Sequence, residues 1–176
     1  DIVLAGDNVA IANSDVETFG FVRSGTARDA GDVRITADQT LTLSERSRVA
    51  TGNESQVPGA PSAAAGNVFL RAGNIVLTGG AQVRADTRAR TAETAQIALD
   101  ATDITISGVR IDNQRDGTGF NLSSLNDASN PRLSIVATDD LSASSATIVS
   151  QNQSGSSGAA NALQLMAGDQ LVLLDS

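Results

Sequence analysis

The chain of 176 residues contains no cysteine, histidine, lysine, tryptophan or tyrosine. Without cysteine, it forms neither a disulfide nor a thiolate metal site. Without histidine, lysine or tyrosine, acidic residues and arginines are the main material left for a catalytic site. Aromatic residues make up only 2% of the chain. We therefore expect a core of Ile, Val, Leu and Ala, as in the narrow interiors of parallel sheets.

Positive charge is also scarce. The chain has 12 arginines against 20 acidic residues, for a formal net charge of -8. This balance disfavours a nucleic-acid partner, which would require a basic stripe, and it offers no basic patch to an anionic membrane. The chain has no secretory signal pattern and no long apolar run of the kind that inserts into a membrane.

What the chain does contain is a short apolar pattern that returns six times. Its first and third places hold large aliphatic residues, and its fifth place holds Ala or Gly. The apolar spacing of two residues indicates β-strands, and a period of about 30 residues indicates a solenoid. The six copies are IVLAG (2–6), VRITA (33–37), VFLRA (68–72), IALDA (97–101), LSIVA (133–137) and LQLMA (163–167).

A second alternating segment follows each copy after two or three turn-forming residues, and a third follows in five of the six units. The second strands are expected at 9–11, 41–43, 75–77, 104–106, 141–143 and 171–173. The third strands are expected at 14–18, 47–51, 81–85, 109–113 and 146–150. Variable insertions then follow at 19–32, 52–67, 86–96, 114–132 and 151–162, and they contain all three prolines.

These segments predict one all-β domain over residues 1–176, a right-handed parallel β-helix (solenoid). We expect about five and a half coils, with three short strands and one variable insertion per coil. The units start near 2, 33, 68, 97, 133 and 163. The constant small residue at the fifth place predicts a tight corner of the wall.

The same alignment makes outward residues of adjacent coils neighbours. It places Asp15 beside Arg48, Arg84 beside Asp112, and Arg71 beside Asp100. We expect three ion pairs between coils, each contributing about 0–1 kcal/mol at an exposed site.

Candidate chemistry is limited to acidic residues. Asp103, Asp139 and Asp140 lie at one corner of successive coils, where a carboxylate pair can serve as general acid and base. The simpler interpretation is that these aspartates accept backbone hydrogen bonds in turns. Residues 116–119 (DGTG) lack the calcium-binding loop patterns. We therefore predict no catalytic residue, no cofactor and no metal site.

The phenylalanines offer a different kind of surface. Phe69 is expected to point outward from the first strand, on the same face as Val3, Val136 and Met166. The other three phenylalanines lie in insertions, at Phe19, Phe21 and Phe120. Such a face is either a partner surface or a face that the insertions cover.

The units AGDVRITADQTLTLSERSRVAT (30–51) and AGNVFLRAGNIVLTGGAQVRAD (65–86) resemble the repeats of filamentous-haemagglutinin-like exoproteins of the two-partner secretion family, especially those of cyanobacteria. The resemblance covers essentially all six units. It implies a right-handed parallel β-helix at the bacterial surface, exported through an outer-membrane pore partner. The family's N-terminal secretion motifs are not found in this chain, so no functional residue is carried over.

We therefore expect a structural or adhesive shaft segment of a secreted bacterial surface exoprotein, without enzymatic activity. Its partners would be the secretion pore and a cell-surface, glycan or matrix ligand. One alternative is a component of an extracellular filament or coat that self-associates through open coil ends. Another alternative is an enzyme acting on polysaccharides. Neither end shows a polar cap, so we also expect this chain to be an excerpt of a longer repeat array.

Overall fold

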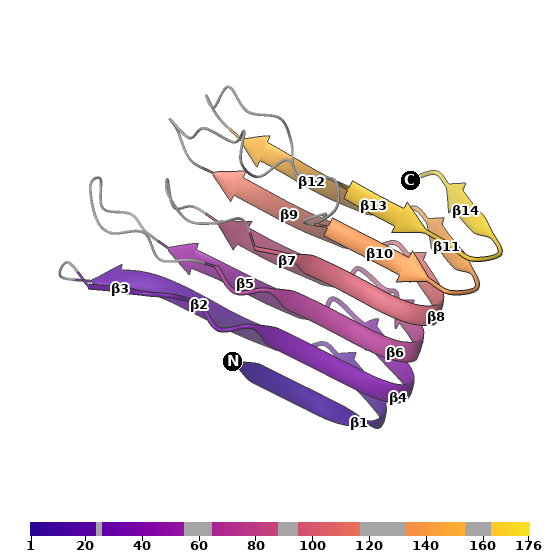
Figure 1. The fold of residues 1–176 in the computed structure, drawn as a ribbon, viewed down its shortest axis with the longest axis horizontal. Helices are drawn as coiled ribbons and strands as arrows, with labels where there is room; N and C mark the ends of the chain where they lie inside the picture. Colours follow the sequence, from indigo (N-terminus) through magenta and orange to yellow (C-terminus); the bar gives the residue numbers. More distant parts are fainter. Residues whose placement is uncertain (24–25, 55–64, 88–94, 117–132, 154–162) are drawn as a thin grey trace.

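The computed structural model describes residues 1–23, 26–54, 65–87, 95–116, 133–153 and 163–176. Within these ranges every regular element is a β-strand. The strands form an eight-stranded sheet and a six-stranded sheet. All pairs are parallel except the pair between β2 and β3. The chain is a β-solenoid, and its two termini lie at opposite ends of the stack (Figure 1).

The eight-stranded sheet contains the first and second strands of every unit. Its members are β1 (Ile2–Ala12), β4 (Val33–Ser44), β6 (Val68–Leu77), β8 (Ile97–Ser107), β10 (Leu133–Ala137), β11 (Leu141–Ser144), β13 (Leu163–Met166) and β14 (Leu171–Leu174). The predicted register is confirmed. The first places pair from coil to coil in the order Ile2, Val33, Val68, Ile97, Leu133 and Leu163.

The six-stranded sheet contains the third strands. Its members are β2 (Asp15–Arg23), β3 (Thr26–Arg28), β5 (Arg48–Glu54), β7 (Gln82–Thr87), β9 (Arg110–Asp116) and β12 (Thr147–Gln153). The predicted central column is confirmed, with Val16, Val49, Val83, Ile111 and Ile148 in register.

The strand boundaries differ from the prediction in two ways. In β1, β4, β6 and β8 the first and second strands form one continuous strand, because backbone pairing persists through most of the turn. The turn leaves only a shift of register, between Gly6 and Asn8 and between Ala37 and Thr40. The third strands also run past their predicted ends, and the expected insertion 19–32 holds the end of β2 and all of β3.

Alternate side chains of both sheets fill one shared interior. Val33, Val49, Val68 and Val83 are each 0% exposed. Such burial contributes about 1.5–3 kcal/mol per large aliphatic side chain. The largest fully buried side chains are Ile35, Leu41, Leu43, Leu70, Ile75, Leu77, Ile97, Leu99, Ile104, Ile106 and Ile111.

A second corner, between the two sheets, uses left-handed backbone in every coil. Gly79 and Gly80 have φ values of 63° and 78°, a region that glycine enters without a steric penalty. Glu45 and Arg46 adopt the same region in the preceding coil, and the Arg46 N–H donates to the Gly79 carbonyl at 2.9 Å. The residues with positive φ at this corner are Asn13, Glu45, Arg46, Gly79, Gly80, Gly108, Ser145 and Asp175.

The fifth place of the repeat lies at the corner within the eight-stranded sheet. Ala37, Ala72, Ala101 and Ala137 pair in register there, and all four are buried. Because coils stack directly above and below each methyl group, the corner has no room for a larger side chain.

We therefore expect Ala72→Leu to overpack this corner and to lower the free energy of unfolding by about 1–3 kcal/mol. Ala98→Leu is the matched control, since Ala98 lies on the outer face of the adjacent β8 and is only partly buried. Its effect should stay within about 0.5 kcal/mol. Urea unfolding of the two variants measures both values, and equal effects would contradict the assigned corner.

Candidate functional site

Two of the three aspartates considered for catalysis, Asp103 and Asp140, accept hydrogen bonds from backbone amides. Asp103 Oδ1 accepts a hydrogen bond from the Asp140 N–H at 3.4 Å. Asp140 Oδ1 in turn accepts from the Gln170 N–H at 3.2 Å. Each carboxylate thus reaches the turn of the next coil, as the simpler interpretation of these residues predicted. This arrangement satisfies turn amides, which carry a strong demand for partners.

The structure adds one acidic neighbour that the sequence did not single out. Asp139, Asp140 and Asp169 are exposed, and they offer carboxylate oxygens within 4.8 Å of one another. Oxygen donors of this kind suit hard cations, but Ca²⁺ takes 6–8 ligands, so water would have to supply most of the shell. The loop at 116–119 lies mostly outside the described residues.

Phe69 points outward from β6, as predicted, and it is partly covered. The Arg34 guanidinium lies over its ring, 4.4 Å from the ring centroid. Arg34 also forms an ion pair with Asp32, with Nη2 to Oδ2 at 2.7 Å. A cation above an aromatic ring is favourable by about 0.5–1 kcal/mol at an exposed site. This surface is therefore ordered by its own contacts.

Other apolar residues of the predicted face remain exposed. Val3 is 68% exposed and Met166 is 49% exposed. Phe19 and Phe21 are 47% and 49% exposed on β2, and the Phe19 ring lies against Gly52 of β5. Phe120 lies outside the described residues. Phe19 and Phe21 therefore present an apolar surface on β2.

The three predicted charge pairs are in register, but only one of them forms the predicted ion pair. Arg71 Nε lies 3.8 Å from Asp100 Oδ2, as expected between adjacent coils. Asp15 is in register with Arg48, and Arg84 with Asp112. Arg48, however, pairs with Glu17 at 2.7 Å, two places along β2.

In the next coils the arginine pairs within its own strand. Arg84 pairs with Asp86 at 2.9 Å, and Arg110 pairs with Asp112 at 2.7 Å. In each case the two partners stand two places apart on one strand. Residues two places apart share one face of a strand, so a long guanidinium reaches along the strand as easily as across it.

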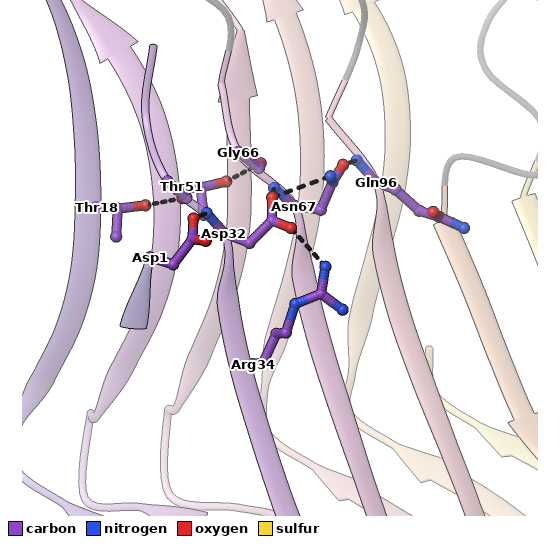
Figure 2. Close-up of polar contacts among 9 residues, drawn as sticks. Asp1, Thr18, Asp32, Arg34, Thr51, Gly66, Asn67 and Gln96 are labelled. Atoms are coloured by element: carbon purple, nitrogen blue, oxygen red, sulfur yellow. Dashed lines mark hydrogen bonds and ion pairs between the residues drawn. The ribbon is translucent and has the colours of Figure 1, made fainter. Parts of the chain in front are cut away.

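A ladder of polar side chains forms at the start of the coils, in the column just before the first place (Figure 2). We call it the start ladder: Asp1, Asp32, Asn67 and Gln96. Asp1 Oδ1 accepts from the Asp32 N–H at 2.8 Å, and Asp32 Oδ1 accepts from the Asn67 N–H at 2.9 Å. Asn67 Oδ1 accepts from the Gln96 N–H at 2.9 Å. The side chains of Asp1, Asp32 and Asn67 therefore each hold the backbone of the following coil.

Two threonines of the six-stranded sheet tie it to the start of the next coil. The Thr18 hydroxyl donates to the Gly31 carbonyl, and the buried Thr51 hydroxyl donates to the Gly66 carbonyl (Figure 2). Both hydroxyls come from inward places of the third strand. They satisfy carbonyls that leave regular pairing where the chain returns to the first strand.

The surroundings of Asp32 in the start ladder change the pKa of its carboxyl group. Partial burial raises the pKa of its carboxyl group. Hydrogen bonds from the Asn67 N–H and the Arg34 guanidinium, with the positive charge of Arg34, more than offset that effect. The net pKa therefore lies below the ordinary value of 3.8. Asp32 acts as an ionised acceptor within the fold.

Searches against known protein families, curated proteins and solved structures found no match to this chain. In the described part of the chain, no helix is long and apolar enough to span a membrane.

The start ladder is the feature that sequence reasoning missed. Part of its signal was present in the sequence. The residue before a first place carries a side-chain oxygen acceptor in the first four units, whereas Arg132 and Ala162 stand there in the last two. Asp103, Asp140 and the start ladder fasten coils to one another. Their carboxylates and amides are positioned to accept backbone N–H groups.

We expect the stability contribution of Asp32 to depend on pH. A carboxyl with a lowered folded-state pKa stabilises the fold above its unfolded-state pKa, and the contribution is lost as pH falls through the folded-state value. Asp32→Asn should therefore be less stable than wild type at neutral pH, and the difference should shrink below about pH 4. Urea unfolding across pH measures it, with Asp7→Asn as a control for loss of one exposed charge. A constant difference across pH would contradict this role.

Asp140→Ala leaves the Gln170 N–H without its side-chain acceptor. We expect it to lower the free energy of unfolding by about 0.5–1.5 kcal/mol. Asp139→Ala is the matched control, because Asp139 is exposed on the same turn. Its side chain accepts none of these amide bonds, so its effect should stay within about 0.5 kcal/mol. Thermal unfolding of both variants tests this, and a larger loss in the control would contradict the structural role.

Proposed function

We propose that the chain is a structural and adhesive shaft segment of a secreted bacterial surface exoprotein of the filamentous-haemagglutinin-like type. In finer detail, we take the solenoid to be right-handed, with three strands per coil and about five and a half coils. Export would use the outer-membrane pore partner of two-partner secretion, and the shaft would stand at the cell surface. We propose no enzymatic activity.

The observation that carries this proposal is the use of polar side chains between coils. The acceptors Asp1, Asp32, Asn67, Asp103 and Asp140 all bind backbone amides of the following coil. A chain whose polar side chains fasten one coil to the next in this way is suited to bearing a load along its axis. The resemblance of its repeats to exoprotein shafts supports the same proposal.

The enzyme alternative has less support. It requires Asp103 and Asp140 to converge with an arginine in a groove. Instead, each carboxylate accepts a backbone amide at the turn of the next coil. A general acid and base must be free to exchange protons with a substrate, and these oxygens are committed to the fold.

For adhesion, we propose as the contact surface the outer face of the eight-stranded sheet where the first strands of the repeat lie. We define this face as Arg34, Thr36, Phe69, Arg71 and Asp100. The Arg71 side chain is 76% exposed, and Thr36 is exposed beside it. An ordered aromatic ring next to charged and hydroxyl groups suits a glycan, whose sugar rings present both an apolar face and hydroxyl groups.

A glycan-array screen with the purified chain tests the adhesive function. We expect binding to a subset of glycans, reduced roughly tenfold by Phe69→Ala. Val76→Ala is the matched control, since Val76 is an outward residue of the same strand on the neighbouring part of the sheet. Absence of binding, or equal loss in both variants, would argue against adhesion through this face.

A further inference from the structure

The contact surface contains two arginines, and each of them has a carboxylate partner. Arg34 Nη2 lies 2.7 Å from Asp32 Oδ2, and Arg71 Nε lies 3.8 Å from Asp100 Oδ2. In the second and fourth places of the described first strands, the charged residues are Arg34, Arg71 and Asp100. With Asp32 beside Arg34, two positive charges stand against two negative charges. The surface therefore has charged groups but no net charge to attract an ion.

The first pair leaves Arg34 little freedom to bind an anion. Its guanidinium lies over the Phe69 ring and donates a hydrogen bond to Asp32 at 2.7 Å (Figure 2). Asp32 is itself fixed, because its Oδ1 accepts from the Asn67 N–H at 2.9 Å and from Asn67 Nδ2 at 3.1 Å. A carboxylate of a ligand would have to displace Asp32 from Arg34, and charge-assisted hydrogen bonds of this kind are the strong ones.

The second pair is looser and more accessible. The side chains of Arg71 and Asp100 are 76% and 56% exposed, and the two residues are in register between β6 and β8. A separation of 3.8 Å is an ion pair but is too long for a hydrogen bond. Both groups can therefore form hydrogen bonds with a ligand, the carboxylate as acceptor and the guanidinium as donor.

Adjacent hydroxyl groups of a sugar match this second pair. Each hydroxyl can both donate and accept, so one can donate to Asp100 while its neighbour accepts from Arg71. An ionised carboxylate only accepts, and it would lie beside the negative charge of Asp100. Repulsion between like charges is a general means of rejecting a wrong ligand. Without Asp100, Arg71 would present a free guanidinium, which binds carboxylates by parallel hydrogen bonds.

Phe69 supplies the apolar part of the same surface. It stands two places from Arg71 on β6, about 6.6 Å along the strand, so one sugar ring and its hydroxyl groups can contact both. Its register partner on β8 is Ala98, which is small. The apolar face of a sugar ring can therefore approach Phe69 from the side of Ala98, while Arg34 covers the ring from the side of β4.

We infer that the contact surface is selective for neutral sugars with adjacent hydroxyl groups, and that Asp32 and Asp100 exclude sugars that carry a carboxylate. The inference rests on the proposed adhesive function, and it adds the class of ligand and two residues that determine specificity. Asp100 is the better of the two to replace, because it is exposed and lies outside the start ladder.

Asp100→Asn removes the negative charge and keeps the shape of the side chain. Its binding is measured on an array that carries neutral oligosaccharides beside the same oligosaccharides with a uronic acid in place of the neutral sugar. The quantity compared is the ratio of uronic-acid binding to neutral binding within each variant. We expect a ratio below about 0.1 for wild type and a rise of about tenfold in D100N. About 0.5 M salt should remove most of that rise, because it screens the exposed Arg71.

Asp7→Asn is the matched control, since it also removes one exposed negative charge but lies at the corner of β1, outside the contact surface. Its ratio should stay within about twofold of the wild-type ratio. A wild type that binds uronic acids as tightly as neutral sugars would overturn the inference and leave adhesion standing. An unchanged ratio in D100N, or an equal rise in D7N, would do the same. Absence of binding to every glycan would overturn adhesion and the inference together.

Discussion

The structure depends on the register of aliphatic columns between coils. Each coil is too narrow to bury its own side chains, and Val33 or Ile97 becomes inaccessible only because equivalent residues lie above and below it. Parallel pairing at a constant register is therefore the source of both the backbone hydrogen bonds and the core. A slip of one residue would turn every inward side chain toward solvent, so the aliphatic pattern itself prevents slippage.

Polar side chains reinforce that register at the places where regular pairing weakens. The start ladder holds the backbone at Asp32, Asn67 and Gln96, where three coils begin. Asp103 and Asp140 hold a turn, and Thr18 and Thr51 hold the return segments. These groups lie at the corners, where backbone amides and carbonyls change direction. The interior can thus consist of aliphatic residues, while the corners supply the directional bonds that hydrophobic burial lacks.

The register was predictable from the sequence because it follows from a spacing of two residues and from the constant small fifth place. Phe69 could be placed on the outer face for the same reason. The partner of Arg71 was predictable in the same way, whereas the partners of Arg48 and Arg84 were not. The alignment set Arg84 opposite Asp112, but Asp86, two places along the same strand, also lies within reach of its guanidinium.

The sequence also did not show that the first and second strands of a unit form one continuous strand. Asp38 and Gln39 are turn formers by propensity, yet pairing with neighbouring coils keeps most of that segment within one strand, so tertiary context overrides local preference. The grouping of Asp139 and Asp140 with Asp169 depended on how corners of equal length stack, which a single repeat does not reveal. Residues within one column were thus predictable, whereas contacts that cross columns required the coordinates.

The side-chain acceptors of the start ladder all reach in one direction, from each coil to the one that follows it in the chain. In each bond the acceptor precedes the donor in the chain: Asp1 accepts from the Asp32 N–H, and Asp32 accepts from the Asn67 N–H. A polypeptide that folds from its amino-terminal end would therefore meet oriented oxygens on Asp1, Asp32 and Asn67 as its second, third and fourth coils form. The direction of these hydrogen bonds therefore favours formation of the coils in order, from the amino-terminal end onward.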